Sequence, residues 1–145
     1  METKGRQPSS VGRETPTWWG PGPGLMAIAL AVSWVAMLAH NLYELPLTPW
    51  DVENSGPLVV DVLLLVAYWR RPASRAVPLV ILGWAALNLV IGGVVSVLPL
   101  AVLPFVPEQS LSHYAAHVLY AAGQVPLILV AVAALRRRPH ETMSR

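Results

Sequence analysis

The positive charges of this chain fall in three short places, and the long stretches between them carry none. Ten of its 145 residues are Lys or Arg. No Lys or Arg occurs between Glu14 and Trp69, or between Ala76 and Leu135. A soluble domain spreads its charged residues over most of its elements, since they make up about a quarter of such a chain. This distribution therefore predicts that the long stretches without cations lie in a membrane.

The composition agrees with a membrane protein. Hydrophobic residues make up 54% of the chain and charged residues only 12%. There is no cysteine, which excludes disulfides, thiolate metal sites and cysteine nucleophiles. The excess of Arg over Lys and the many Ala, Val and Leu residues indicate a bacterial protein of the plasma (inner) membrane. The first apolar run is long enough to remain as an anchor, so no cleaved signal peptide is predicted.

Four apolar segments are predicted to cross the membrane as helices, because backbone polar groups in lipid must be satisfied within the segment. A span needs about 20 apolar residues, and the second segment is short for this and contains Asp61. The predicted fold is an all-α integral membrane protein with a four-transmembrane-helix bundle. Its predicted parts are a disordered tail over 1–23, spans at about 24–45, 57–69, 76–98 and 112–135, and a basic tail over 136–145.

The cations also predict the orientation of the bundle. They lie before the first span, between the second and third spans, and after the fourth. By the positive-inside rule these three places are cytoplasmic, which puts both termini inside. The loops around Asp51 and Glu108 are then outside. The basic C-terminal segment is interpreted as a topology determinant that contacts anionic lipid, and no nucleic-acid partner is predicted.

Each predicted span carries one polar stripe at helical spacing, and such stripes face the interior of a bundle. At about 1.5 Å of rise per residue, His40, Asp61 and His117 lie at one depth in the outer half. Glu44 and His113 lie nearer the outer boundary. Gly92, Gly93 and Gly123 are expected to let the helices approach closely. The stripes comprise Ser33, His40 and Glu44; Asp61 and Tyr68; Asn88, Gly92 and Ser96; and His113, His117, Tyr120 and Gln124.

These residues predict a site for a divalent metal ion or a proton in the outer half of the membrane. An ionised Asp61 needs a cationic partner, and no Lys or Arg lies at that depth. Imidazoles and carboxylates together suit Zn, Fe, Mn or Cu(II). The predicted ligands are His40, Glu44, Asp61, His113 and His117.

Four alternatives remain open, and whether the chain is an enzyme is not decided. A b-type haem between His40 and His117 is less favoured, because haem propionates usually pair with cations and the outer side has none. Proton or ion transport would use the same titrating groups. A small membrane enzyme would use His40 and Glu44 as acid and base. That His-x-x-x-Glu pair resembles the one in sterol isomerase-like four-helix membrane proteins, a likeness that rests on two residues and assigns no family.

The fourth alternative is a structural one. Polar residues within spans can also form interhelical hydrogen bonds worth about 0.6 to 2 kcal/mol each, and Asn88 and Gln124 are assigned to this role. The chain would then be a scaffold or an accessory subunit. The predicted partners are the lipid bilayer and either further copies of the chain or a larger membrane complex.

Overall fold

The computed structural model describes residues 20–103 and 106–136, and this part of the chain contains helices and turns but no strand. Most of the two predicted tails lies outside the described residues, namely 1–19 of the tail over 1–23 and 137–145 of the basic tail over 136–145. All four predicted spans are confirmed as helices long and apolar enough to cross a membrane. The elements are α1 (Pro23–Glu44), α2 (Val52–Arg70), α3 (Ala76–Leu87), its π-helical and 3-10 continuations η1 (Asn88–Val94) and η2 (Val95–Val97), and α4 (Leu111–Leu135).

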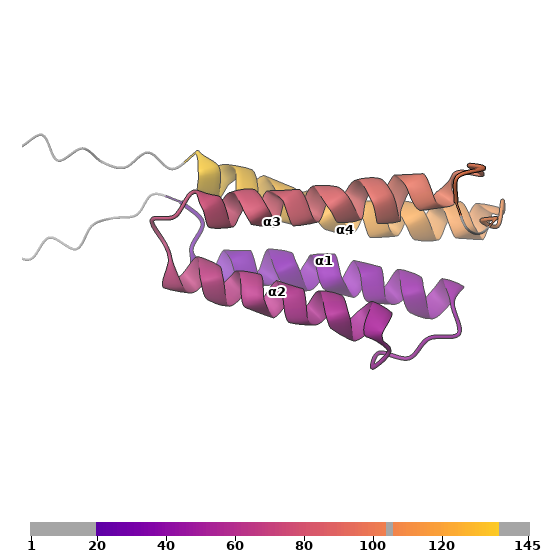
Figure 1. Cartoon of the computed structure of the whole chain (residues 1–145), viewed down its shortest axis with the longest axis horizontal. Helices are drawn as coiled ribbons and strands as arrows, with labels where there is room; N and C mark the ends of the chain where they lie inside the picture. The colour runs from indigo at the N-terminus through magenta and orange to yellow at the C-terminus, as the bar shows by residue number, and fades with distance from the viewer. Residues whose placement is uncertain (1–19, 104–105, 137–145) are drawn as a thin grey trace, which may run out of the picture.

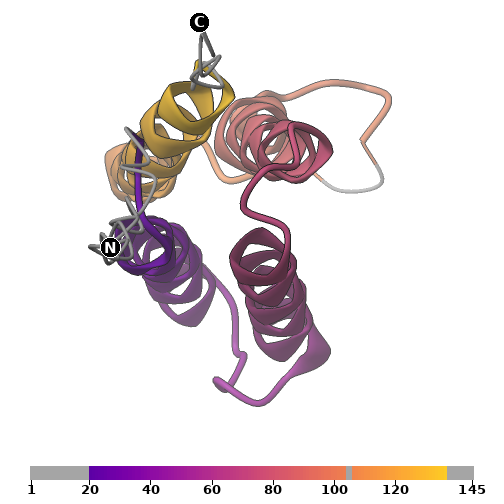
Figure 2. The ribbon, with the colours of Figure 1, turned by 90° about the vertical axis from the view of Figure 1, so that its left-hand side faces the viewer.

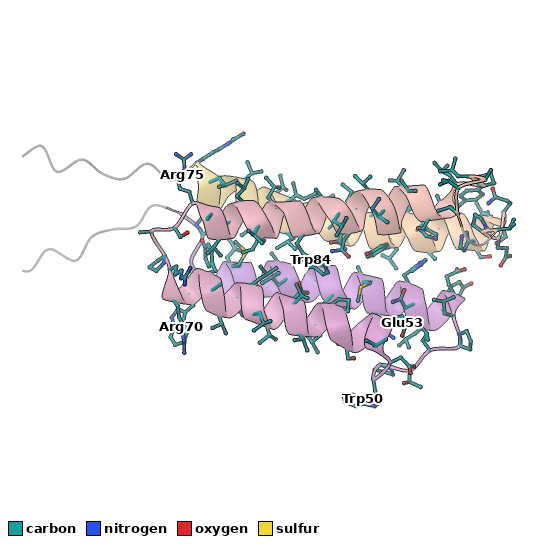
Figure 3. The ribbon with its side chains drawn as sticks, in the orientation of Figure 1. Trp50, Glu53, Arg70, Arg75 and Trp84 are labelled. Atoms are coloured by element: carbon teal, nitrogen blue, oxygen red, sulfur yellow. The ribbon has the colours of Figure 1, made fainter. Side chains whose placement is uncertain are left out.

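The helices run alternately up and down and stand at the corners of a square (Figures 1 and 2). Helix α4 packs on α1 and on α3 with η1, whereas α2 packs mainly on α1 and only lightly on α3. One end of the bundle carries the α2–α3 turn, and the opposite end carries the other two connections. Figure 3 places Arg70 and Arg75 at the first end and Trp50 and Glu53 at the second. We name the first the arginine end, after Arg70, Arg71, Arg75 and Arg136, and the second the acidic end, after Glu44, Asp51, Glu53 and Glu108.

Local sequence explains where α1 and α4 begin and end. Pro23 opens α1 at the first helical position, where a fixed φ and a missing N–H cost nothing. Leu45 is extended, as expected of a residue that precedes a proline. Ser110 caps α4, because its hydroxyl accepts a hydrogen bond from the His113 N–H at 3.2 Å.

Helix α2 begins at Val52, earlier than the predicted start at 57. The residue before it, Asp51, accepts hydrogen bonds at Oδ2 from the Thr48 backbone N–H and hydroxyl. These bonds hold the pKa of Asp51 below its usual range and fix the turn that leads into the helix. Pro57 lies inside α2, where it removes the bond that its own N–H would have made to Glu53 and its ring crowds the Glu53 carbonyl. The proline therefore does not mark the helix start.

The interior of the bundle changes from apolar to polar along its length. Toward the arginine end, the core is built from aliphatic side chains and Tyr68, whose hydroxyl donates to the Pro21 carbonyl at 2.6 Å. Ser33, Asp61 and Gln124 are buried near the middle, and Asn54 and His117 are buried toward the acidic end. The buried apolar core comprises Met26, Ala29, Leu30, Tyr68, Val77, Ile81, Ala85, Leu127, Ala131 and Ala134.

Glycines set the closest helix contacts, as predicted. A Cβ placed on Gly123 would lie 2.2 Å from the Ala36 Cβ, so α1 and α4 touch there through their backbones. A Cβ on Gly92 would lie 2.3 Å from the Tyr120 ring, and one on Gly93 would lie 3.1 Å from the Ala121 Cβ. These approaches bring η1 and α1 against two neighbouring sides of α4, which carries two of the candidate histidines.

Candidate functional site

Three imidazole rings meet near the acidic end of the bundle, where α1 faces the first turns of α4. The ring centroids of His40 and His117 are 4.3 Å apart, and those of His113 and His117 are 4.5 Å apart. His40 also stacks on the Tyr120 ring at a centroid distance of 5.5 Å. We name His40, His113 and His117 the histidine cluster. The structure thus brings together the three histidines that the sequence predicts to share a site.

Glu44 fixes the orientation of the outermost ring in the cluster. His113 Nδ1 lies 2.5 Å from Glu44 Oε2, and the two side chains are only 12% and 11% exposed. Because a carboxylate can only accept a hydrogen bond, Nδ1 of His113 carries the proton. In the neutral ring, Nε2 of His113 therefore keeps a lone pair. Glu44 acts on the site through His113, with one of its oxygens already occupied.

The carbonyl of Gly92 fixes His117 in the same way. His117 Nδ1 lies 3.0 Å from this carbonyl oxygen, which also accepts a bond from the Ser96 hydroxyl at 2.6 Å. A carbonyl can only accept, so Nδ1 carries the proton and Nε2 of the neutral His117 ring keeps a lone pair. Gly92 belongs to the π-helical segment η1, and such segments often occur at functional sites because they displace carbonyls from regular helical bonding.

Two nitrogens of the cluster are buried without a partner. His40 Nδ1 and His113 Nε2 are enclosed and have no hydrogen-bond partner within the part of the chain that the structure describes. Leaving a buried polar atom unpaired costs about 1 to 3 kcal/mol. Paired polar groups elsewhere in the bundle, such as those of Ser33 with Gln124, avoid this cost. The unpaired nitrogens therefore distinguish the cluster from an ordinary interhelical contact.

Asp61 does not join the histidine cluster. Its Oδ1 accepts a hydrogen bond from Trp84 Nε1 at 2.9 Å, which links α2 to α3. Figure 3 shows Trp84 between the α3/α4 pair and the α1/α2 pair. One helical turn after Trp84, at the start of η1, Asn88 Oδ1 accepts a hydrogen bond from the Tyr120 hydroxyl at 2.9 Å. Asp61 also does not share the depth of the histidines, because α2 begins at Val52 and Asp61 therefore lies at the middle of its helix. Its carboxyl group pairs with Trp84 instead.

The five predicted metal ligands are consequently not assembled as one group. Among residues 20–103 and 106–136, no set of three or more His, Cys, Asp or Glu side chains is placed so that it could hold a metal ion as it stands. Comparisons with protein-family models, curated proteins and solved structures found no match for the chain. The interpretation of the cluster therefore rests on the geometry of its own side chains.

Other polar residues of the spans are paired between helices. The Ser33 hydroxyl donates to Gln124 Oε1 at 2.6 Å and joins α1 to α4. Asn88, bonded to Tyr120, joins η1 to α4. Gln124 is fully buried, and its pairing with Ser33 matches the interhelical role that its sequence position predicts.

Sequence reasoning missed Asn54. This residue is 0% exposed, and its side chain accepts from Asn41 Nδ2 at 2.9 Å and donates to the Thr48 carbonyl at 2.8 Å. Its backbone carbonyl also accepts from Trp34 Nε1 at 2.9 Å. The predicted start of the second span at 57 left Asn54 in a loop. The signal that places it inside the helix is Asp51, three residues earlier, at the N-cap.

We expect Asn54→Ala to lower the free energy of unfolding by about 1 to 3 kcal/mol, because Asn41 and the Thr48 carbonyl lose their buried partner. Unfolding of the detergent-solubilised protein, followed by helical circular dichroism, measures this change. Glu53→Ala is the matched control, since Glu53 is the exposed neighbour on the same turn. Equal stability of the two variants would contradict a structural role for Asn54.

Proposed function

We propose that this chain is a multi-pass bacterial inner-membrane protein with both termini in the cytoplasm and the acidic end facing outward. Large apolar side chains cover the outside of the helices, as expected of a lipid-facing surface. They include Leu25, Ile28, Val59, Val62, Leu63, Leu79, Val118 and Leu129. The described arginines lie at one end of the bundle, and cytoplasmic loops carry the excess of Lys and Arg.

The absence of cysteine gives a clean test of this orientation. Single cysteines are introduced at Glu108, at the acidic end, and at Ala73, in the exposed α2–α3 turn. A membrane-impermeant maleimide applied to intact spheroplasts is expected to label Glu108→Cys at once and Ala73→Cys only after permeabilisation. The reverse pattern would overturn the orientation. Labelling of both variants in intact spheroplasts would contradict the placement of the two positions on opposite sides of the membrane.

We further propose that the histidine cluster binds a cation, either a divalent metal ion or a proton. The observation that carries this proposal is the pair of fixed tautomers. Glu44 and the Gly92 carbonyl each occupy an Nδ1–H, so the lone pair lies on Nε2 in the neutral rings of His113 and His117. Nε2 of His113 is buried and has no hydrogen-bond partner within the described residues. A group that accepts electron pairs, and therefore a cation, is the chemistry that satisfies them.

The charges around the cluster favour the same kind of ligand. Four carboxylates lie at the acidic end, and the sequence places no Lys or Arg between 76 and 135 or between 15 and 69. A negative rim of this kind raises the local concentration of cations. It also disfavours anions such as carboxylates or phosphates. The partly exposed Glu44 and His113 offer the route from the acidic end to the buried His117.

Nitrogen NMR tests this proposal without assuming which cation binds. In protein labelled with nitrogen-15 histidine, ring nitrogens that carry a lone pair, a proton or a metal ion differ in chemical shift. We expect the Nε2 signals of His113 and His117 to move when Zn²⁺ is added or the pH is lowered. Their loss in His113→Ala and His117→Ala assigns them, and His140→Ala removes the remaining histidine that is not part of the cluster. Signals unmoved by either cation would overturn the proposal.

A further inference from the structure

We infer that His40, His113 and His117 together hold one divalent transition-metal ion through three imidazole nitrogens, with Glu44 and the Gly92 carbonyl orienting two of the rings. This inference rests on the proposed cation site and names its ligand. It differs from the five-residue set that the sequence predicts, because Asp61 takes no part and Glu44 contacts the ion only through His113.

The outer contacts of the rings are those that metal-binding histidines use. A ligating histidine almost always donates its other ring N–H to a carboxylate or a backbone carbonyl, which fixes the tautomer and makes the ligating nitrogen more basic. His113 has the carboxylate version of this contact, with Glu44, and His117 has the carbonyl version, with Gly92. In a cluster that only bridged helices, we would expect both nitrogens of each ring to be hydrogen-bonded to protein groups.

The spacing of two ring pairs is close to that of imidazoles that share one ion. Two imidazoles bound to one ion at about 2.0 Å place their ring centroids about 5 Å apart. The observed centroid distances are 4.3 and 4.5 Å, so each pair separates by less than about 1 Å on binding. His40 Nδ1 has no hydrogen bond to lose when this ring turns. The described residues contain no ready-made set of three ligands, so ion binding requires these rings to turn.

The carboxyl groups of Asp61 and Glu44 each accept a hydrogen bond from another side chain. Asp61 Oδ1 accepts from Trp84, and Glu44 Oε2 accepts from His113. An all-imidazole set suits Zn²⁺, Co²⁺, Ni²⁺ or Cu²⁺ and disfavours Mg²⁺ and Ca²⁺, which prefer oxygen ligands. The negative charge of Glu44 partly compensates the ion in an apolar setting. Three protein ligands leave a fourth position open for water or a substrate.

Titration of the purified full-length protein with Co²⁺ tests the ligand set, because Co²⁺ replaces Zn²⁺ and absorbs visibly when nitrogen ligands surround it. We expect one Co²⁺ per chain. Each of His40→Ala, His113→Ala and His117→Ala should lower the affinity about 100-fold or more. Glu44→Gln should lower it about 10-fold, because it keeps a hydrogen-bond acceptor and loses the charge. Asp61→Asn and His140→Ala are the controls and should bind as the wild type does.

X-ray absorption of the wild-type Co²⁺ complex keeps the test decisive if a histidine variant fails to fold. Three imidazole ligands are expected in that spectrum. Loss of Co²⁺ in Asp61→Asn, full binding in any histidine variant, or fewer than three imidazoles would overturn the ligand set while the proposed cation site stands. A wild-type protein that binds neither Co²⁺ nor Zn²⁺ would overturn the inference as a whole. The nitrogen NMR response to pH then decides the proposed function separately.

Discussion

Gly123→Ala is expected to lower the free energy of unfolding by about 1 to 3 kcal/mol, the usual cost of overpacking a tight interior. The added Cβ would stand 2.2 Å from the Ala36 Cβ. Both atoms are fixed to helix backbones, so neither can swing aside, and α1 has to move away from α4. Thermal unfolding in detergent, followed by circular dichroism, measures the loss.

Two further variants show whether the clash itself is responsible. Gly83→Ala adds the same methyl group to a helical glycine that has no atom within 4 Å of its Cβ position. It is expected to be neutral or to stabilise by up to about 1 kcal/mol, because alanine favours helix. Gly123→Ala combined with Ala36→Gly removes the opposing methyl group and should recover most of the lost stability. Failure of this double variant to recover would show that α1 and α4 do not meet at these two residues.

The same contact bears on the histidine cluster. His40 lies on α1 one turn beyond Ala36, and His117 lies on α4, so the α1–α4 separation sets the distance between their rings. A Gly123→Ala protein that still folds should therefore bind Co²⁺ more weakly than the wild type, although Gly123 touches no ligand. Gly83→Ala should bind normally.

Charge and apolar length were enough to predict the helices, whereas side-chain pairing was not. The cation-free stretches flanking Arg70 and Arg75 predict two helical hairpins, because insertion into lipid leaves few other solutions. Burial of Ser33, His117 and Gln124 follows from helical periodicity. The first turn of α2 escaped prediction, because proline is favoured at a helix start and disfavoured inside a helix, so Pro57 pointed to a start at 57.

The composition of the cluster depends on packing that periodicity does not encode. His40 and His117 meet because Gly123 lets α1 approach α4 closely, and His117 pairs with the carbonyl of Gly92 in η1. Asp61 lies apart because α2 begins at Val52, which places Asp61 at the middle of its helix, where it pairs with Trp84. The depth of a residue therefore depends on where its helix begins, and the helix separations decide which residues touch.

Trp84→Phe is expected to destabilise the protein by about 1 to 3 kcal/mol, because it removes the donor to a buried carboxyl group and keeps one aromatic ring in place of the indole. Asp61 is only 5% exposed, so water replaces the indole N–H poorly. Asp61→Asn keeps an acceptor for Trp84 and should cost less. Unfolding of the three proteins in the same detergent gives the comparison.

The double variant Asp61→Leu/Trp84→Phe separates the bond from the residues that make it. Replacing both partners of a buried polar contact by apolar groups is often nearly neutral, so the double variant should be more stable than the sum of its single changes predicts, by about 1 to 2 kcal/mol. Additive losses would show that the indole N–H and the carboxyl group do not interact. Because Asp61 lies outside the histidine cluster, the double variant should also keep its Co²⁺. This result would show that the α2–α3 contact and cation binding depend on different residues.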